Sequence, residues 1–144
     1  STLNSLIGLL DYELRVGKDE RISAARKRGE EYLLRRELLF KLSTGEQVGR
    51  WATEFISPAR WRYSTLRALT YFMDARKFDR AAIDSRLEKA IDSVRTRENE
   101  RGRWINDWVE KGAVWVEVDA PIGEESKWNT FMAIRVLNWF DSTK

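Results

Sequence analysis

One arginine and two tryptophans near the C-terminal end of the chain are the side chains most suited to binding a ligand. Trp128, Arg135 and Trp139 are spaced so that, on a helix, they share one stripe. A guanidinium among apolar side chains is unfavourable unless it is paired, and its planar donors suit phosphate and carboxylate groups. Arg135 could therefore hold the head group of an apolar molecule. Alternatively, Arg135 reaches solvent along its stem or pairs with a neighbouring Asp or Glu.

Two aspartates form a second candidate ligand-binding site. Asp11 and Asp74 occupy matching positions in two similar apolar segments, residues 2–16 and 58–76. If these segments are neighbouring helices, the two carboxylates could face one another and perform acid–base chemistry or bind a cation. Solvent exposure near the helix ends explains the same two residues without a site.

Two further groups of residues permit a site but do not require one. Acidic residues cluster before the last predicted helix, at Glu117, Asp119, Glu124 and Glu125, and hard cations need several converging oxygens. Aromatic residues that could line a cleft for a lipid or a sugar are Trp51, Trp61, Tyr63, Trp104, Trp108 and Trp115. A solvated loop explains the acids, and packing in the core and turns explains most of the aromatic residues. We therefore assign no metal ion and no cofactor.

The composition excludes several classes of protein. The 144 residues include no His and no Cys, which excludes disulfides, thiol nucleophiles, imidazole bases and the common zinc ligand sets. Hydrophobic residues make up 42% and charged residues 34%, a balance typical of a globular domain. No apolar stretch approaches the roughly 18 to 20 residues of a membrane-spanning helix, and no leader opens the chain. We expect one soluble, cytoplasmic domain.

The charge balance argues against a nucleic-acid partner. The 26 basic and 23 acidic residues leave a net charge of only +3. Much of the basic excess lies in residues 20–41, where acidic and basic side chains intermix at helical spacing. A nucleic-acid binder more often shows an uncompensated basic face. We interpret the segment as a solvated helix face.

Hydrophobic residues at helical spacing dominate the chain. They predict helices at residues 2–16, 20–41, 58–76, 81–98 and 126–141. Asp19, Ser57 and Ser126 are candidate N-caps, with Pro58 in a first turn. Only residues 112–118, GAVWVEV, alternate with period two, which allows one short strand near 113–118.

The apolar helices repeat. RYSTLRAL at 62–69 matches KWNTFMAI at 127–134, and TLNSLIGLL at 2–10 matches the first of these more loosely. Amphipathic helices of a second type lie between the copies, so the pattern predicts repeated helical hairpins with an apolar inner and an amphipathic outer layer. The segment at 126–141 is apolar nearly all round, and we therefore expect neighbours on both of its sides.

The second type of helix carries a family resemblance. KAIDSVRTRENERGRW at 89–104 keeps the basic start, Gly102 and Trp104 of the motif repeated in squalene-hopene cyclases, and RGEEYLLRRE at 28–37 keeps its first half. Glu98 and Glu37 replace the glutamine of that motif. With SPARWRYSTLRALTYF and ESKWNTFMAIRVLNWF, the chain resembles the α/α-toroid superfamily of terpenoid cyclases and protein prenyltransferase β subunits, and most closely the C-terminal half of uncharacterised bacterial members.

This resemblance implies an all-α fold in which repeated hairpins over residues 1–144 form part of an α/α toroid, the C-terminal part of a longer chain. It also implies that Trp104 and Glu98 are structural, with Trp104 stacking under the next helix end and Glu98 accepting hydrogen bonds from backbone donors there. The family activities do not carry over, because the chain has no DxDD element and no Cys or His for zinc. We do not assign it an enzymatic activity.

Two functions remain open. The first is a terpenoid-cyclase-like domain that binds an apolar, isoprenoid-type molecule near Arg135, Trp128, Trp139, Asp11 and Asp74. The second is a non-catalytic helical scaffold that self-associates or pairs with another subunit, because unpaired inner helices would expose apolar surface. The two differ in whether Trp128, Arg135 and Trp139 face a cavity or a partner.

Overall fold

The protein is all-α in the part that the structure, a computed structural model, describes, residues 1–112 and 114–142. Its helices are α1 (Thr2–Val16), α2 (Glu20–Leu34), α3 (Thr65–Asp79), α4 (Glu88–Arg95) and α5 (Lys127–Asp141), with 3₁₀ turns at Arg50–Thr53 and Ser85–Leu87. The predicted strand is wrong, since residues 114–118 form none; Ala113 lies outside the described residues. Only isolated bridges, such as that between Phe40 and Gln47, pair extended backbone within the described ranges.

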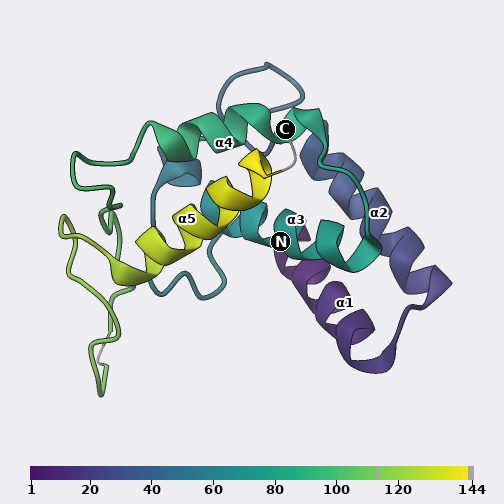
Figure 1. The fold of residues 1–144 in the computed structure, drawn as a ribbon, viewed down its shortest axis with the longest axis horizontal. Coiled ribbons are helices and arrows are strands. Elements are labelled where there is room, and N and C mark those ends of the chain that lie inside the picture. Colours follow the sequence, from purple (N-terminus) through teal and green to yellow (C-terminus); the bar gives the residue numbers. More distant parts are fainter. Residues whose placement is uncertain (113, 143–144) are drawn as a thin grey trace.

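The helices form two layers that alternate along the chain. α1 contacts α3 and α3 contacts α5, so these three form a row that we call the inner layer. α2 packs against α1, and α4 packs against both α3 and α5, so α2 and α4 form the outer layer (Figure 1). The alternation agrees with the repeated hairpins read from the sequence.

The inner layer is covered best at its centre. Along α3, the side chains of Leu69, Phe72 and Met73 have no exposed surface, because α1, α4 and α5 surround them. α1 and α2 approach each other closely at Gly29. A Cβ atom there would lie 2.8 Å from Leu6 Cδ2, so the glycine is needed for this contact.

Side-chain caps define the helix starts. Asp19 accepts hydrogen bonds from the backbone N–H groups of α2, and Ser126 accepts one from Asn129 of α5, so both predicted caps are confirmed. The predicted cap at Ser57 is wrong. Its peptide bond to Pro58 is cis, and α3 begins later, where Ser64 accepts from the backbone N–H of Arg67.

Two further predicted helices are too long. α2 ends at Leu34 rather than at residue 41, because Glu37 and Leu38 adopt positive φ angles of 46° and 62° that no α-helix contains. The segment predicted at 81–98 contains only the 3₁₀ turn and α4, Glu88–Arg95. Some of the apolar residues that suggested these longer helices lie on irregular backbone and still pack into the core. Leu38, for example, is 3% exposed.

Trp104 joins the end of α4 to the start of α5. Its side chain is 1% exposed, and its indole N–H donates to the carbonyl of Val94 at 2.8 Å. Its backbone N–H donates to Thr130 Oγ1 at 3.1 Å, and its carbonyl accepts from Ser126 at 2.9 Å. The predicted structural position of Trp104 is confirmed. Glu98 is exposed and accepts no hydrogen bond among the described residues, so that expectation is wrong.

A buried asparagine ties the segment between α4 and α5 to the turn before α3. Asn106 has no exposed surface, and its amide nitrogen donates to the carbonyls of Ser57 (3.2 Å) and Ala120 (2.8 Å). Its Oδ1 accepts from the backbone N–H of Ser57 at 3.0 Å. These bonds fix the irregular residues 56–60 beside α3 and α5.

Replacing Trp104 with alanine should destabilise the fold strongly. We expect W104A to lower the free energy of unfolding by about 3 to 5 kcal/mol, the usual range for a buried aromatic residue. W115A is the matched control, because Trp115 is fully exposed, and it should change stability by less than about 0.5 kcal/mol. Denaturant unfolding measures both, and an unchanged midpoint for W104A would refute this position.

Candidate functional site

The structure brings Trp128 and Arg135 together on the surface of α5 and separates them from Trp139. Trp128 is 53% exposed and meets the ring of Phe131 edge-on, with centroids 6.2 Å apart. The Arg135 guanidinium lies 5.4 Å from the same Phe131 ring. Trp139 is buried at 9% exposure and borders a different depression, with Arg76 and residues 81–83. The three predicted residues therefore do not converge on one cavity.

The surroundings of Arg135 agree with the second of its two interpretations, in which the side chain reaches solvent and approaches a neighbouring carboxylate. Its nearest carboxylate oxygen is Asp74 Oδ1, 4.0 Å from Nη2, and both side chains are well exposed. Its Nη1 also lies 3.7 Å from Met132 Sδ. An exposed ion pair at this distance contributes at most about 1 kcal/mol.

The two predicted aspartates do share a groove. Asp11 and Asp74 both line a depression of about 340 Å³ between α1 and α3, together with Ile7, Leu10, Leu14, Arg67, Thr70 and Tyr71. Each carboxylate has an arginine beside it, since Asp11 pairs with Arg15 at 3.0 Å and Asp74 lies near Arg135. The groove therefore does not present two free negative charges to a cation.

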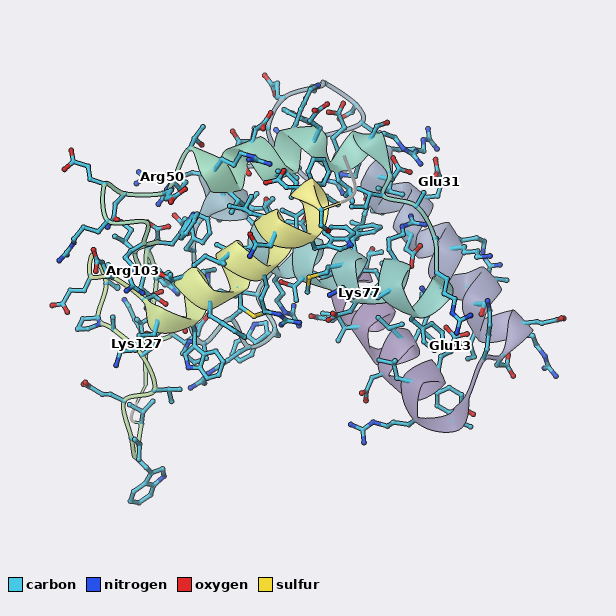
Figure 2. All side chains as sticks on the ribbon, in the orientation of Figure 1. Glu13, Glu31, Arg50, Lys77, Arg103 and Lys127 are labelled. Atoms are coloured by element: carbon cyan, nitrogen blue, oxygen red, sulfur yellow. The ribbon has the colours of Figure 1, made fainter. Side chains whose placement is uncertain are left out.

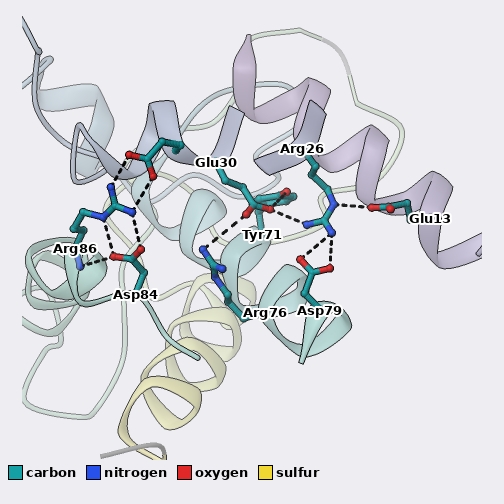
Figure 3. A network of polar contacts seen from close by, with 9 residues as sticks. Glu13, Arg26, Glu30, Tyr71, Arg76, Asp79, Asp84 and Arg86 are labelled. Atoms are coloured by element: carbon teal, nitrogen blue, oxygen red, sulfur yellow. Dashed lines mark hydrogen bonds and ion pairs between the residues drawn. The ribbon is translucent and has the colours of Figure 1, made fainter. Parts of the chain in front are cut away.

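A buried network of charges, which the sequence did not predict, lies where α1, α2 and α3 meet (Figure 3). Arg26 has no exposed surface. Its Nε donates to Glu13 Oε2 at 2.7 Å and its Nη1 to Glu30 Oε1 at 2.7 Å. Its Nη2 donates to both carboxylate oxygens of Asp79, at 2.8 and 2.9 Å. One guanidinium thus joins carboxylates from all three helices.

Further contacts complete the network. The Tyr71 hydroxyl donates to Glu30 Oε1 at 2.7 Å, and the Ser23 hydroxyl donates to Glu13. Arg76 Nη2 lies 3.8 Å from Glu30 Oε2, and Lys18 approaches Asp79 at 4.0 Å. The negative charges are therefore largely balanced inside the protein.

The network shifts the pKa values of Glu13, Tyr71 and Arg26. Burial opposes ionisation of Glu13, but the hydrogen bonds from Ser23 and Arg26 outweigh it and hold the pKa of Glu13 below its ordinary value. Burial, together with the nearby Glu30 carboxylate, raises the pKa of the Tyr71 phenol. Burial also opposes the charge on Arg26, yet its hydrogen bonds keep the guanidinium protonated, with a raised pKa.

We assign the network to stability rather than to chemistry. Glu13 and Arg26 are fully enclosed, so a substrate cannot reach them. The sequence carried a weak signal, the spacing of Arg26 and Glu30 one helical turn apart, but the same spacing occurs in exposed pairs. The interpretation of residues 20–41 as a solvated face is wrong at Arg26 and Glu30, which are both buried.

The acidic loop before α5 is used to start that helix. Asp119 accepts from the backbone N–H groups of Ala120 (2.9 Å) and Lys127 (3.1 Å), and from the Ser126 hydroxyl. Burial opposes its ionisation, but these bonds hold the pKa of Asp119 below its ordinary value. Within the described ranges, no group of three or more acidic side chains could hold a metal ion.

The candidate aromatic residues are scattered. Trp51 and Tyr63 meet edge-on, with ring centroids 5.8 Å apart, and border a depression of about 270 Å³ with Tyr32 and Arg36. Trp61 is exposed, and Trp115 projects fully into solvent. They do not line a common cleft.

One flank of α5 is open, contrary to the expected neighbours on both sides. In α3, Leu66 and Leu69 are 6% and 0% exposed. Their equivalents in the repeat, Phe131 and Ile134, are 50% and 43% exposed in α5. The difference arises because α3 has helices of both layers beyond it, whereas α5 is the last helix of the row (Figure 1). The open flank of α5 therefore exposes apolar side chains whose equivalents in α3 are buried.

Comparison with known proteins adds no assignment. No family model matches the chain, and searches of curated proteins and of solved structures found no match. The similarity to α/α toroids therefore stays a prediction. Across residues 1–112 and 114–142, no helix is long and apolar enough to cross a membrane.

Removing the Arg26 charge should destabilise the protein more than removing an exposed one. R26M leaves Glu13, Glu30 and Asp79 buried without their central partner, and we expect a loss of about 3 to 5 kcal/mol in the free energy of unfolding. R15M is the control, because the Arg15 side chain is 75% exposed and should contribute at most about 1 kcal/mol. Equal losses for the two variants in urea unfolding would contradict the structural role of the network.

The cost of R26M should also depend on pH. A carboxylate whose folded-state pKa is lowered stabilises the protein fully above its unfolded pKa, and loses that contribution as the pH falls through the folded value. For Glu13 the loss begins below the ordinary value of 4.5. The difference in unfolding free energy between wild type and R26M should therefore shrink on acidification. Unfolding curves recorded at pH 7 and at pH 3 measure it, and a difference that grows at pH 3 would contradict the assignment.

Proposed function

We propose that this chain is a non-catalytic helical-repeat module that associates head to tail with a second copy of itself. The contact joins the open flank of α5, around Phe131, Ile134 and Asn138, to the opposite flank of α1, around Ser5 and Gly8. The open flank of α5 is the observation that carries the proposal.

The α5 flank has the character of a helix-packing surface. Its positions match Leu66, Leu69 and Met73 of α3, which are all buried, and Leu66 borders the same depression as Asn129 and Met132 of α5. In α3, therefore, this flank receives the next helix of the inner layer. The corresponding flank of α5 offers half-exposed Phe131 and Ile134 for the same use.

The α1 flank is open on the opposite side. In α3 the matching residues, Ala68, Tyr71 and Ala75, are at most 3% exposed, and Tyr71 borders the groove shared with α1. Their equivalents in α1 are Ser5, Gly8 and Tyr12, and all three are exposed. A Cβ at Gly8 would meet nothing within 4 Å. Ser5 and Gly8 are small, so another helix can approach this part of the flank closely.

We infer that the two flanks are complementary, because α1 and α3 share a groove through residues whose repeat equivalents lie on these flanks. α3 contributes Tyr71 to the groove that it shares with α1, and the repeat equivalent of Tyr71 in α1 is Gly8. α1 contributes Leu10 to the same groove, and the repeat equivalent of Leu10 in α5 is Asn138. A second copy placed with its α1 beside α5 would continue the inner layer with the packing found between α1 and α3. Such a contact is heterologous, and it yields rings or chains rather than a symmetric pair.

Binding of an apolar molecule by a terpenoid-cyclase-like domain is a second proposal. It is supported by the two depressions on the inner layer, of about 340 and about 210 Å³, which both include Arg67 and Thr70. In this proposal an isoprenoid-type molecule lies across α1, α3 and α5, with Asp11 and Asp74 at one end of the groove. Arg135 approaches this groove from α5, since its Nη2 lies 4.0 Å from Asp74 Oδ1, and Trp128 lies on the same surface of α5 beside Phe131.

Two variants with one damaged flank each should fail to associate alone but should pair when mixed. I134D places a charge on the α5 flank, and G8R places a bulky charge on the α1 flank; each should weaken self-association at least about tenfold, a change of about 1.4 kcal/mol. Mixed together, I134D and G8R retain one intact contact and should form a heterodimer that grows no further. Light scattering after size-exclusion chromatography, at high micromolar concentration, measures both outcomes.

The control is L42D, because Leu42 is 51% exposed and lies outside both flanks. It should associate like wild type. The proposal is contradicted if wild type stays monomeric at these concentrations, or if the mixed variants remain separate. A symmetric contact through α5 alone would show instead as normal association of G8R.

A further inference from the structure

A small pocket between α3, α5 and the turn before α3 carries positive charge without any acidic residue. Its volume is about 210 Å³, and it lies on the inner layer rather than on either flank. Its lining residues are Ile56, Ala59, Arg60, Ser64, Leu66, Arg67, Thr70, Asn129 and Met132. No carboxylate is among them, although Asp and Glu together number 23 in the chain.

Arg67 is partly buried without an anionic partner. Its Nη1 donates to Asn4 Oδ1 at 2.6 Å and to the carbonyl of Arg62 at 3.2 Å. Both acceptors are neutral, and no described carboxylate lies within ion-pairing distance. They therefore hold the guanidinium in place without cancelling its charge. Burial of the side chain disfavours its charged form and lowers the pKa of Arg67.

Other partly buried arginines of the protein do pair with carboxylates. Arg62 pairs with Glu110, and Arg97 donates to both oxygens of Asp107, at 2.6 and 2.7 Å. Arg86 makes a two-point contact with Glu31 at 2.9 and 3.0 Å. A desolvated guanidinium without such a partner gains most from an added anion.

Arg60 brings a second free guanidinium to the same pocket. It is exposed, with neither a hydrogen bond nor an ion pair to any described residue. Its backbone has a φ of 44°, a left-handed conformation that non-glycine residues seldom adopt. It also borders a neighbouring cavity with three carboxylates. Glu110 binds Arg62 and Asp119 binds the start of α5, while Glu117 is exposed and forms no ion pair with Arg60. Arg60 is therefore available to an anion.

We propose that this pocket binds a phosphate group, through Arg67 from within and Arg60 from the rim. The hydroxyl groups of Ser64 and Thr70 and the Asn129 amide give it further polar atoms, while Ile56, Leu66 and Met132 give it an apolar floor. The chemistry suits either free phosphate or a phosphate ester with a short apolar substituent. The inference does not rest on head-to-tail association, because the pocket lies apart from the flanks.

Titration of the 144-residue chain with inorganic phosphate and with hexyl phosphate, by isothermal calorimetry at constant ionic strength, tests the proposal. We expect both compounds to bind wild type. R67M should weaken both at least about tenfold, about 1.4 kcal/mol, and R60M should weaken them less. R86M, which removes a paired arginine, is the control and should bind like wild type. Tighter binding of hexyl phosphate identifies an ester as the ligand, and equal binding identifies free phosphate.

Either of two results would overturn the proposal. The first is the absence of binding by wild type at millimolar phosphate. The second is undiminished binding by both R67M and R60M. Because Arg67 also contacts Asn4, circular dichroism of each variant checks that it is folded. If R67M does not fold, R60M still tests the proposal, because the Arg60 side chain has no polar contact to lose within the described residues.

Discussion

The buried Arg26 guanidinium is the interaction on which the rest of the structure depends. It joins carboxylates of α1, α2 and α3. Glu13, one of these carboxylates, lies at one end of the molecule, far from Lys127 at the start of α5 (Figure 2). Charges taken out of water are stable only when all are paired, so the cluster permits essentially one arrangement of the three helices. That arrangement sets the first hairpin beside α3 and so determines the direction in which the inner layer grows.

The same layered packing explains both proposed surfaces. Within the described residues each inner helix packs against the next, α5 is the last of the row, and its outer flank is open. Its half-exposed Phe131 and Ile134 are the side chains that the next helix would cover. The inner face of the row is a separate surface, and Arg67 in its pocket forms no ion pair with any described residue. Association and anion binding can therefore operate independently.

The repeat was predictable from the sequence because it depends on local patterns. The apolar spacing of α1 and α5 and the caps at Asp19 and Ser126 each involve residues close in the chain. The cis peptide at Ser57, the end of α2 and the Arg26 network depend on contacts between distant segments, so local pattern did not reveal them. A buried ion pair and an exposed one share the same spacing along a helix.

The candidate site was harder to predict than the fold. Trp128 and Arg135 were correctly placed on one stripe, but an apolar flank awaiting a partner has the same composition as a buried face. Only the structure separates Trp139, which is buried, from Trp128, which is not. Arg67 gave no signal in the sequence, because the lack of a carboxylate partner is a property of the folded surroundings.

The most direct test of head-to-tail association is site-specific disulfide formation, which the absence of native cysteine makes clean. Leu10 and Tyr71 line one groove between α1 and α3, and their repeat equivalents are Asn138 of one copy and Gly8 of the next. Mixed N138C and G8C chains should therefore cross-link to each other faster than either cross-links to itself. Equal rates for all three pairings would contradict head-to-tail association.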